Sequence, residues 1–64
     1  MNDTEFFVYN VTFVYERFHM TVTVLAVDEE DAPESAIEQM RYDMGMSYQI
    51  FDRAQEINVQ KVEN

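Results

Sequence analysis

The chain has 64 residues, of which 47% are hydrophobic and 14% aromatic, so it is long enough for one small domain with a hydrophobic core. Its 13 Asp and Glu residues against 4 Lys and Arg give a formal net charge of −9, which argues against direct binding of nucleic acid or of an anionic membrane. The absence of cysteine excludes disulfides and thiol catalysis. We therefore expect a single domain over residues 1–64.

The N-terminal residues are acidic, and the longest apolar run is Val24–Val27. This run is far shorter than the roughly 20 apolar residues that a membrane span needs, and a signal peptide begins with basic residues. We expect neither a signal peptide nor a transmembrane helix, and a cytoplasmic location.

Apolar residues alternate with other residues over two segments before residue 27, which predicts two β-strands. The alternating residues are Phe7, Tyr9, Val11, Phe13 and Tyr15, and then Phe18, Met20, Val22, Val24 and Ala26. With Glu16 and Arg17 as the turn, antiparallel pairing places all of them on one face of a hairpin. A longer loop over 15–19 is the alternative, because this turn lacks the Gly or Asn that two-residue primed turns prefer.

A helix is predicted after the acidic run Asp28–Asp31, because acidic residues are favourable at a helix N-terminus. Pro33 belongs in the first turn, so Asp31 or Ala32 is the expected N-cap, and Asp31 to Glu34 reads as a capping box. Gly45 provides the C-terminal stop. A stripe at helical spacing should cover the aromatic face of the hairpin, with its Met residues in the core rather than in an exposed binding groove: Pro33, Ala36, Ile37, Met40 and Met44.

The C-terminal part is expected to form a short second helix over 47–53, capped by Ser47 and anchored by Tyr48 and Phe51; a packed loop is the alternative. A third strand is predicted over 56–62, where Ile57 alternates with polar residues. This strand should lie beside the first and parallel to the second. The predicted fold is α+β, a β-hairpin–helix–strand (ββαβ) domain with a three-stranded sheet in the order 2-1-3 and one helix on one face.

The segment Val24 to Glu38 consists of an apolar strand, the turn Ala-Val-Asp-Glu-Glu-Asp-Ala and an acidic helix that contains alanine. In this pattern the chain resembles small acidic accessory proteins encoded by bacteriophages. Several such families share a hairpin–helix–strand arrangement and inhibit host defence or regulatory proteins, among them anti-CRISPR proteins and DNA mimics. The pattern covers most of the chain but contains no diagnostic motif, so the resemblance implies an inhibitor or adaptor without assigning a role to any residue.

The sequence predicts no catalytic residue, no cofactor and no metal. Gly45 is the only glycine, so a glycine-rich phosphate loop is excluded, and His19 has no predicted Ser or Asp partner. Adjacent acids such as Asp28–Asp31 point in different directions and lack the glycine of a calcium loop, so we interpret them as helix-start residues rather than calcium ligands. We expect a non-enzymatic protein.

Two hypotheses for function follow from the surface. In the first, Glu30, Glu34 and Glu38, spaced by four and supported by Glu29 and Asp31, form a negative row that contacts a basic partner protein, one candidate being a protein that normally binds nucleic acid. An ordinary solvated helix face, with the repulsion eased by Arg41 three residues after Glu38, explains the same spacing. In the second, the chain is an assembly module that forms a homodimer through the uncovered sheet face, which carries Val8, Val14 and Leu25, or through the edge of the second strand.

Overall fold

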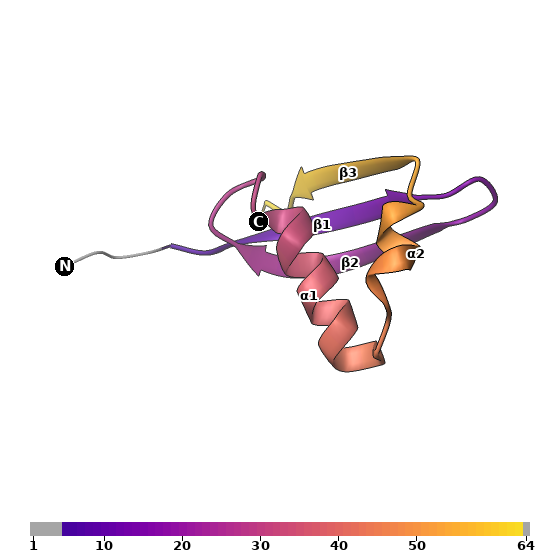
Figure 1. The fold of residues 1–64 in the computed structure, drawn as a ribbon. Coiled ribbons are helices and arrows are strands. Elements are labelled where there is room, and N and C mark those ends of the chain that lie inside the picture. Colours follow the sequence, from indigo (N-terminus) through magenta and orange to yellow (C-terminus); the bar gives the residue numbers. More distant parts are fainter. Residues whose placement is uncertain (1–4, 64) are drawn as a thin grey trace.

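The computed structural model describes residues 5–63, with two long strands, a helix, a short helix and a third strand in chain order (Figure 1). The elements are β1 (Phe7–Val14), β2 (His19–Ala26), α1 (Ala32–Met44), α2 (Tyr48–Asp52) and β3 (Glu56–Lys61). The sheet has the order β2-β1-β3, and both neighbours of β1 are antiparallel to it. The predicted α+β class, strand order and strand directions are confirmed.

The β1–β2 hairpin has the predicted register. Val11 pairs with Val22 and Phe13 with Met20, and the Tyr15 N–H donates to the Phe18 carbonyl at 2.8 Å, so Glu16 and Arg17 form the tip. Among the described residues Gly45 alone has a positive φ, so the tip is not a primed turn. The buried face fixes the register here, because a slip by one residue would expose every core side chain of the hairpin.

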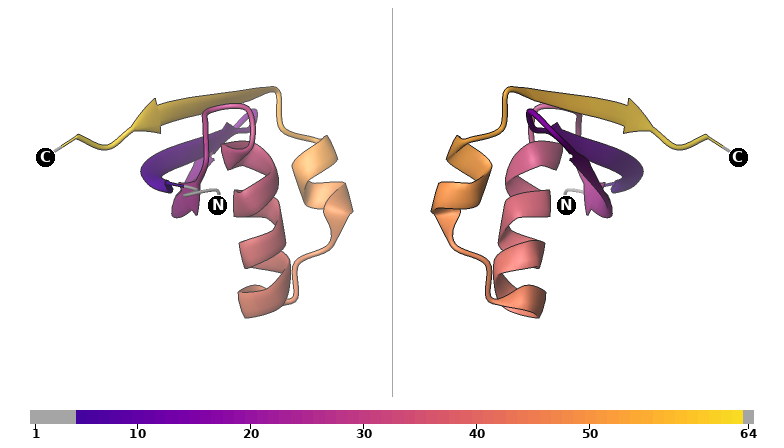
Figure 2. Two further views of the ribbon diagram at one scale, coloured as in Figure 1. Left: turned by 90° about the vertical axis from the view of Figure 1, so that its left-hand side faces the viewer. Right: turned by 90° about the vertical axis from the view of Figure 1, so that its right-hand side faces the viewer.

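The core lies between the sheet and the two helices, which cover the same face (Figure 2). Val11 and Phe13 are fully buried at its centre, and the ring of Phe13 packs against Phe51 of α2 with 5.2 Å between ring centroids. Phe18 was predicted on this face but is 53% exposed, because it lies at the hairpin tip and stacks on Tyr15 instead.

The start of α1 differs in detail from the predicted capping box. Asp31 is the N-cap and Pro33 lies in the first turn, but the backbone of Asp31 is helical (φ −82°, ψ −20°) and its side chain makes no capping hydrogen bond. The carboxylate of Asp28 instead accepts a hydrogen bond from the Asp31 N–H at 2.9 Å. The helix ends as predicted at Gly45, whose left-handed conformation lets its N–H bond to the Arg41 carbonyl.

The predicted core stripe of α1 is correct at Ala36 and Met40 but wrong at Met44, which is 69% exposed. Figure 2 shows the reason: α1 crosses the strands, and its C-terminal part extends past the sheet edge that β2 forms. A side chain at the end of this helix therefore has no sheet beneath it.

The second helix is present and is capped as predicted, since the Ser47 hydroxyl accepts a hydrogen bond from the Gln49 N–H at 3.2 Å. Phe51 anchors it in the core, but Tyr48 does not, because 53% of its surface is exposed. The ring of Tyr48 lies against the guanidinium of Arg41 on α1, with 4.0 Å between the guanidinium carbon and the ring centroid.

Candidate functional site

The predicted partner-binding acids occupy the turn after β2 and the first part of α1. We call them the acidic surface: Glu29, Glu30, Asp31, Glu34 and Glu38. All except the half-buried Asp31 are exposed. From residue 28 to residue 38 the chain carries six acidic residues and no basic one. Arg41, three residues after Glu38, lines a hollow together with Glu38 and Tyr42, so a cation adjoins the C-terminal end of the acidic surface.

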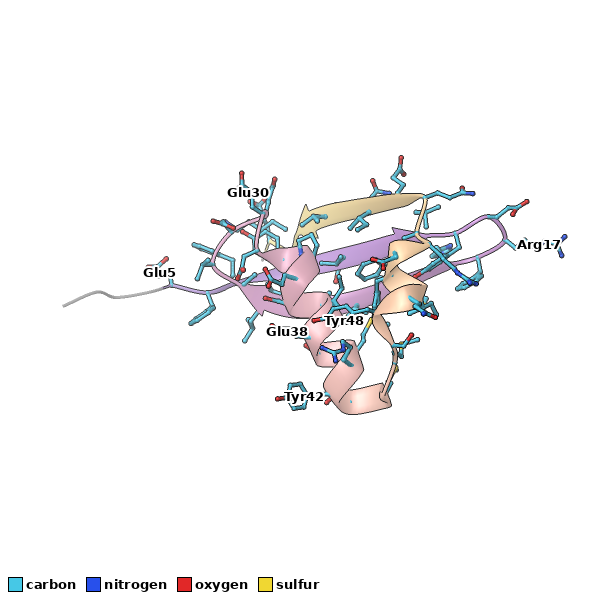
Figure 3. The ribbon with its side chains drawn as sticks, in the orientation of Figure 1. Glu5, Arg17, Glu30, Glu38, Tyr42 and Tyr48 are labelled. Carbon is cyan, nitrogen blue, oxygen red and sulfur yellow. The ribbon has the colours of Figure 1, made fainter. Side chains whose placement is uncertain are left out.

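The predicted continuous helical row is wrong at one end. Because α1 begins at Ala32, Glu30 belongs to the turn before it, and only Glu34 and Glu38 share a helical face at a spacing of four. Figure 3 shows Glu30 at the N-terminal end of α1 and Glu38 farther along the helix. The acidic surface is thus a broad patch around the helix start rather than a single line.

The negative charge of the turn before α1 acts on a tyrosine of the hairpin. Burial and then the negative charges of Glu29 and Asp28 raise the pKa of Tyr9 above its ordinary value of 10.0. Tyr9 lies on β1 and is 4% exposed, so the acidic turn lies close to that end of the sheet. At pH 7 the phenol is neutral and does not add to the negative charge.

Two of the basic residues contact aromatic rings, and a third lies far from the acidic surface. Arg41 lies over the Tyr48 ring, and the ammonium of Lys61 lies 4.0 Å from the centroid of the Phe7 ring. Arg17 is at the hairpin tip, at the opposite end of the molecule from Glu30 (Figure 3).

The residues predicted for self-association lie on the uncovered sheet face but do not form one apolar patch. Val8 and Leu25 are cross-strand partners, and Leu25 is 62% exposed, whereas Val14 pairs with His19 at the other end of the hairpin. Polar hydrogen bonds occupy the space between them: the Thr12 and Thr21 hydroxyls are 2.9 Å apart, and the Thr23 hydroxyl donates to the Asn10 side chain at 2.7 Å.

A shallow groove that we did not predict runs along the free side of β2, where α1 extends past it. We call it the β2–α1 groove; its lining includes Thr21, Thr23, Leu25, Gln39, Tyr42 and Met44. Tyr42 is 91% exposed, and its position in the sequence indicates this exposure. It continues the spacing of Glu34 and Glu38 and falls outside the apolar stripe of α1. Aromatic residues are enriched at protein–protein contact surfaces.

Potential metal ligands beside these surfaces do not form a metal-binding cluster in the described part of the chain. His19 is exposed at the start of β2, and residues 5–63 contain no group of three His, Cys, Asp or Glu side chains placed to hold a metal ion. Within the same residues, neither helix has the length and hydrophobicity required to cross a membrane.

Comparison of the chain with protein-family models, with curated proteins and with solved structures found no match.

Proposed function

We propose that this chain is a non-enzymatic protein-binding module, a small acidic inhibitor or adaptor that occupies a basic surface of a partner protein. The observation that carries the proposal is the acidic surface itself: its five residues and Asp28 lie between positions 28 and 38 with no basic residue among them. A partner that normally holds nucleic acid on a basic groove suits this charge, since the acidic surface then takes the place of phosphates. The proposal includes the bacteriophage-encoded type of inhibitor that the sequence pattern resembles.

The net charge of −9 supports a steered encounter. A surface of one sign raises the association rate with an oppositely charged partner, and the effect weakens as salt shortens the Debye length to about 8 Å at physiological ionic strength. The proposal places the protein in the cytoplasm, a reducing compartment that suits a chain without cysteine. It requires neither a cofactor nor a metal.

The test begins by capturing the partner from an extract of the native host with the tagged protein and identifying it by mass spectrometry. Affinity is then measured for the triple charge reversal Glu30→Lys, Glu34→Lys and Glu38→Lys. The matched control is Glu16→Lys, Asp52→Lys and Glu56→Lys, three exposed acids outside the acidic surface whose reversal changes the net charge equally. Circular dichroism checks that both variants are folded.

The proposal predicts that the first triple loses binding and the control triple keeps most of it. Equal affinity of the first triple and the unmodified protein rules out the acidic surface as the contact. Equal loss in both triples shows that net charge alone, and not this surface, controls binding.

A second candidate is self-association through the uncovered sheet face, and the exposed Leu25 beside Val8 favours it. Sedimentation equilibrium of the Leu25→Lys variant tests this candidate against the unmodified protein at the same concentration. If a dimer forms and the variant remains equally dimeric, the Leu25 face is not the contact.

A further inference from the structure

We infer that the free edge of β2 accepts an extended, basic segment of a partner protein, which adds to the sheet as a fourth strand beside β2 and beneath α1. The inference deepens the proposed function and rests on it, because it states which part of a basic partner binds and how. Backbone hydrogen bonds between β2 and the partner segment add to the electrostatic contact.

The backbone of β2 presents an open row of hydrogen-bonding groups. Tyr15 and Phe18 form a hydrogen-bonded pair, and in an antiparallel ladder every second residue does so, which turns Met20, Val22 and Val24 toward β1. The alternate residues turn their N–H and C=O groups to the free side: His19, Thr21, Thr23 and Leu25. Since β2 is the first strand in the order β2-β1-β3, none of the described strands pairs with these groups.

The helix provides a cover for an added strand. α1 extends past β2 on the core side (Figure 2). The β2–α1 groove, lined by Thr21, Thr23 and Leu25, lies beside this extension. Met40 and the exposed Met44 line the groove from the helix side. A fourth strand would cover these apolar groups and satisfy the free backbone row in one step.

The two edges of the sheet differ in how they oppose strand addition. β3 carries Glu56 and Lys61, and charges on an edge strand hinder pairing with another chain. β2 contains no Asp, Glu, Lys, Arg or Pro, and His19 is its only titratable residue. The edge without these blocking residues is the one that α1 extends over.

The charge of the groove identifies the occupant. Glu38 and Asp43 are the charged residues that line it, and both are acidic. A second copy of this chain would bring a further net charge of −9 to the same place, whereas Lys or Arg on an incoming strand would face opposite charge. The groove therefore fits an extended segment whose alternate residues are basic and face α1, with β-branched residues between them on the uncovered face.

The experiment uses three capped heptapeptides as probes with ¹⁵N-labelled protein at low salt. The first alternates Lys and Val, the second alternates Lys and Pro and has the same charge but cannot join a sheet, and the third alternates Glu and Val. Amide shifts give the affinity, and amide exchange reports new backbone hydrogen bonds. We expect the Lys-Val peptide to slow exchange at Thr21, Thr23 and Leu25, and the other two peptides to leave it unchanged.

Two variants block the groove from different sides. Thr23→Pro removes an outward N–H from the middle of β2 and should abolish the protection. Gln39→Arg leaves β2 untouched and adds a positive charge at an exposed helix position in the groove, so it should weaken Lys-Val binding about tenfold or more. Gln49→Arg on α2 is its matched control and should keep the affinity within about twofold, the change in net charge being the same.

The alternative outcomes separate strand addition from the proposed function. If the Lys-Val and Lys-Pro peptides shift the same amides around residues 28–38 without protecting Thr23, strand addition is wrong and acidic-surface binding stands. If no peptide binds, or if Gln39→Arg binds Lys-Val like its control, strand addition is also wrong. If the protein alone is a dimer whose Thr23 amide loses protection on dilution, the edge holds a second copy, which overturns the inference. The charge-reversal triple tests the proposed function independently of all these results.

Discussion

The Tyr15 hydroxyl at the end of the hairpin donates a hydrogen bond of 2.8 Å to the Ile50 carbonyl in α2. Burial raises the pKa of Tyr15 above 10.0, so this donor keeps its proton at neutral pH. The bond joins residues 35 positions apart and fixes α2 against the sheet. It is a polar link in a protein whose stability otherwise depends on a small apolar core.

Tyr15→Phe should therefore lower the free energy of unfolding by about 0.5–1.5 kcal/mol, the usual net value of one hydrogen bond. Chemical denaturation measures the change, and amide exchange should become faster in α2 first. Tyr42→Phe is the control, because Tyr42 is 91% exposed and its hydroxyl should have no effect. Equal stability of the two variants would show that the Tyr15–Ile50 bond contributes nothing in solution.

Phe13→Ala should destabilise the fold by about 3–5 kcal/mol, because it removes a fully buried ring and leaves Phe51 without its aromatic neighbour. This is a large share of the stability of a small domain, so the thermal midpoint should fall steeply or the chain should unfold. Thr12→Ala, on the uncovered face next to it, should cost much less. A Phe13→Ala midpoint equal to that of the unmodified protein would mean that the two sheet faces are exchanged.

Alanine substitutions of Met40 and Met44 test whether the end of α1 extends past the sheet. Met40 is 5% exposed and Met44 is 69% exposed. Met40→Ala should cost about 2–5 kcal/mol of stability, whereas Met44→Ala should stay within about 0.5 kcal/mol, as exposed substitutions usually do. Urea denaturation of both variants gives the comparison. Similar large losses in both would indicate that the helix end is packed in solution.

Amide exchange of the protein without ligand should alternate along β2. Val22 and Val24 bond to β1 and should exchange slowly, whereas Thr21, Thr23 and Leu25 face the free edge and should exchange quickly. Exchange rates from two-dimensional NMR in D₂O give this pattern. The opposite alternation would place the hairpin one residue out of register.

The titration of Tyr9 tests how close the acidic turn lies. Its pKa is raised above 10.0 by burial and by Glu29 and Asp28, so the folded state favours the neutral phenol. The stability from this preference is complete below pH 10 and is lost as pH rises through the raised pKa. Glu29→Gln should lower the Tyr9 pKa, while Tyr15, shifted by burial alone, should not move. Tyrosine ¹³C NMR measures the pKa values of Tyr9 and Tyr15 separately. A Tyr9 pKa that Glu29→Gln leaves unchanged contradicts the position of the acidic turn beside Tyr9.

The sequence alone determined the hairpin, its register and the ends of α1. Alternation with period two assigns Val11 and Phe13 to one face, and a buried face tolerates only one register. The left-handed conformation that Gly45 adopts at low cost set the end of the helix. These features depend on neighbours in sequence or on a short turn, so local patterns are sufficient to predict them.

The tertiary structure decided where α1 sits relative to the edge of the sheet. A helical stripe shows which side of a helix is apolar but not how far the sheet continues beneath it. The stripe therefore predicts Met44 in the core, whereas Met44 is exposed at the end of α1, the part of the helix that extends past β2. The same crossing created the β2–α1 groove between Thr23 and Gln39, residues far apart in sequence. Their proximity depends on the position and crossing angle of a packed helix, which results from the whole core and leaves no periodic signal in the chain.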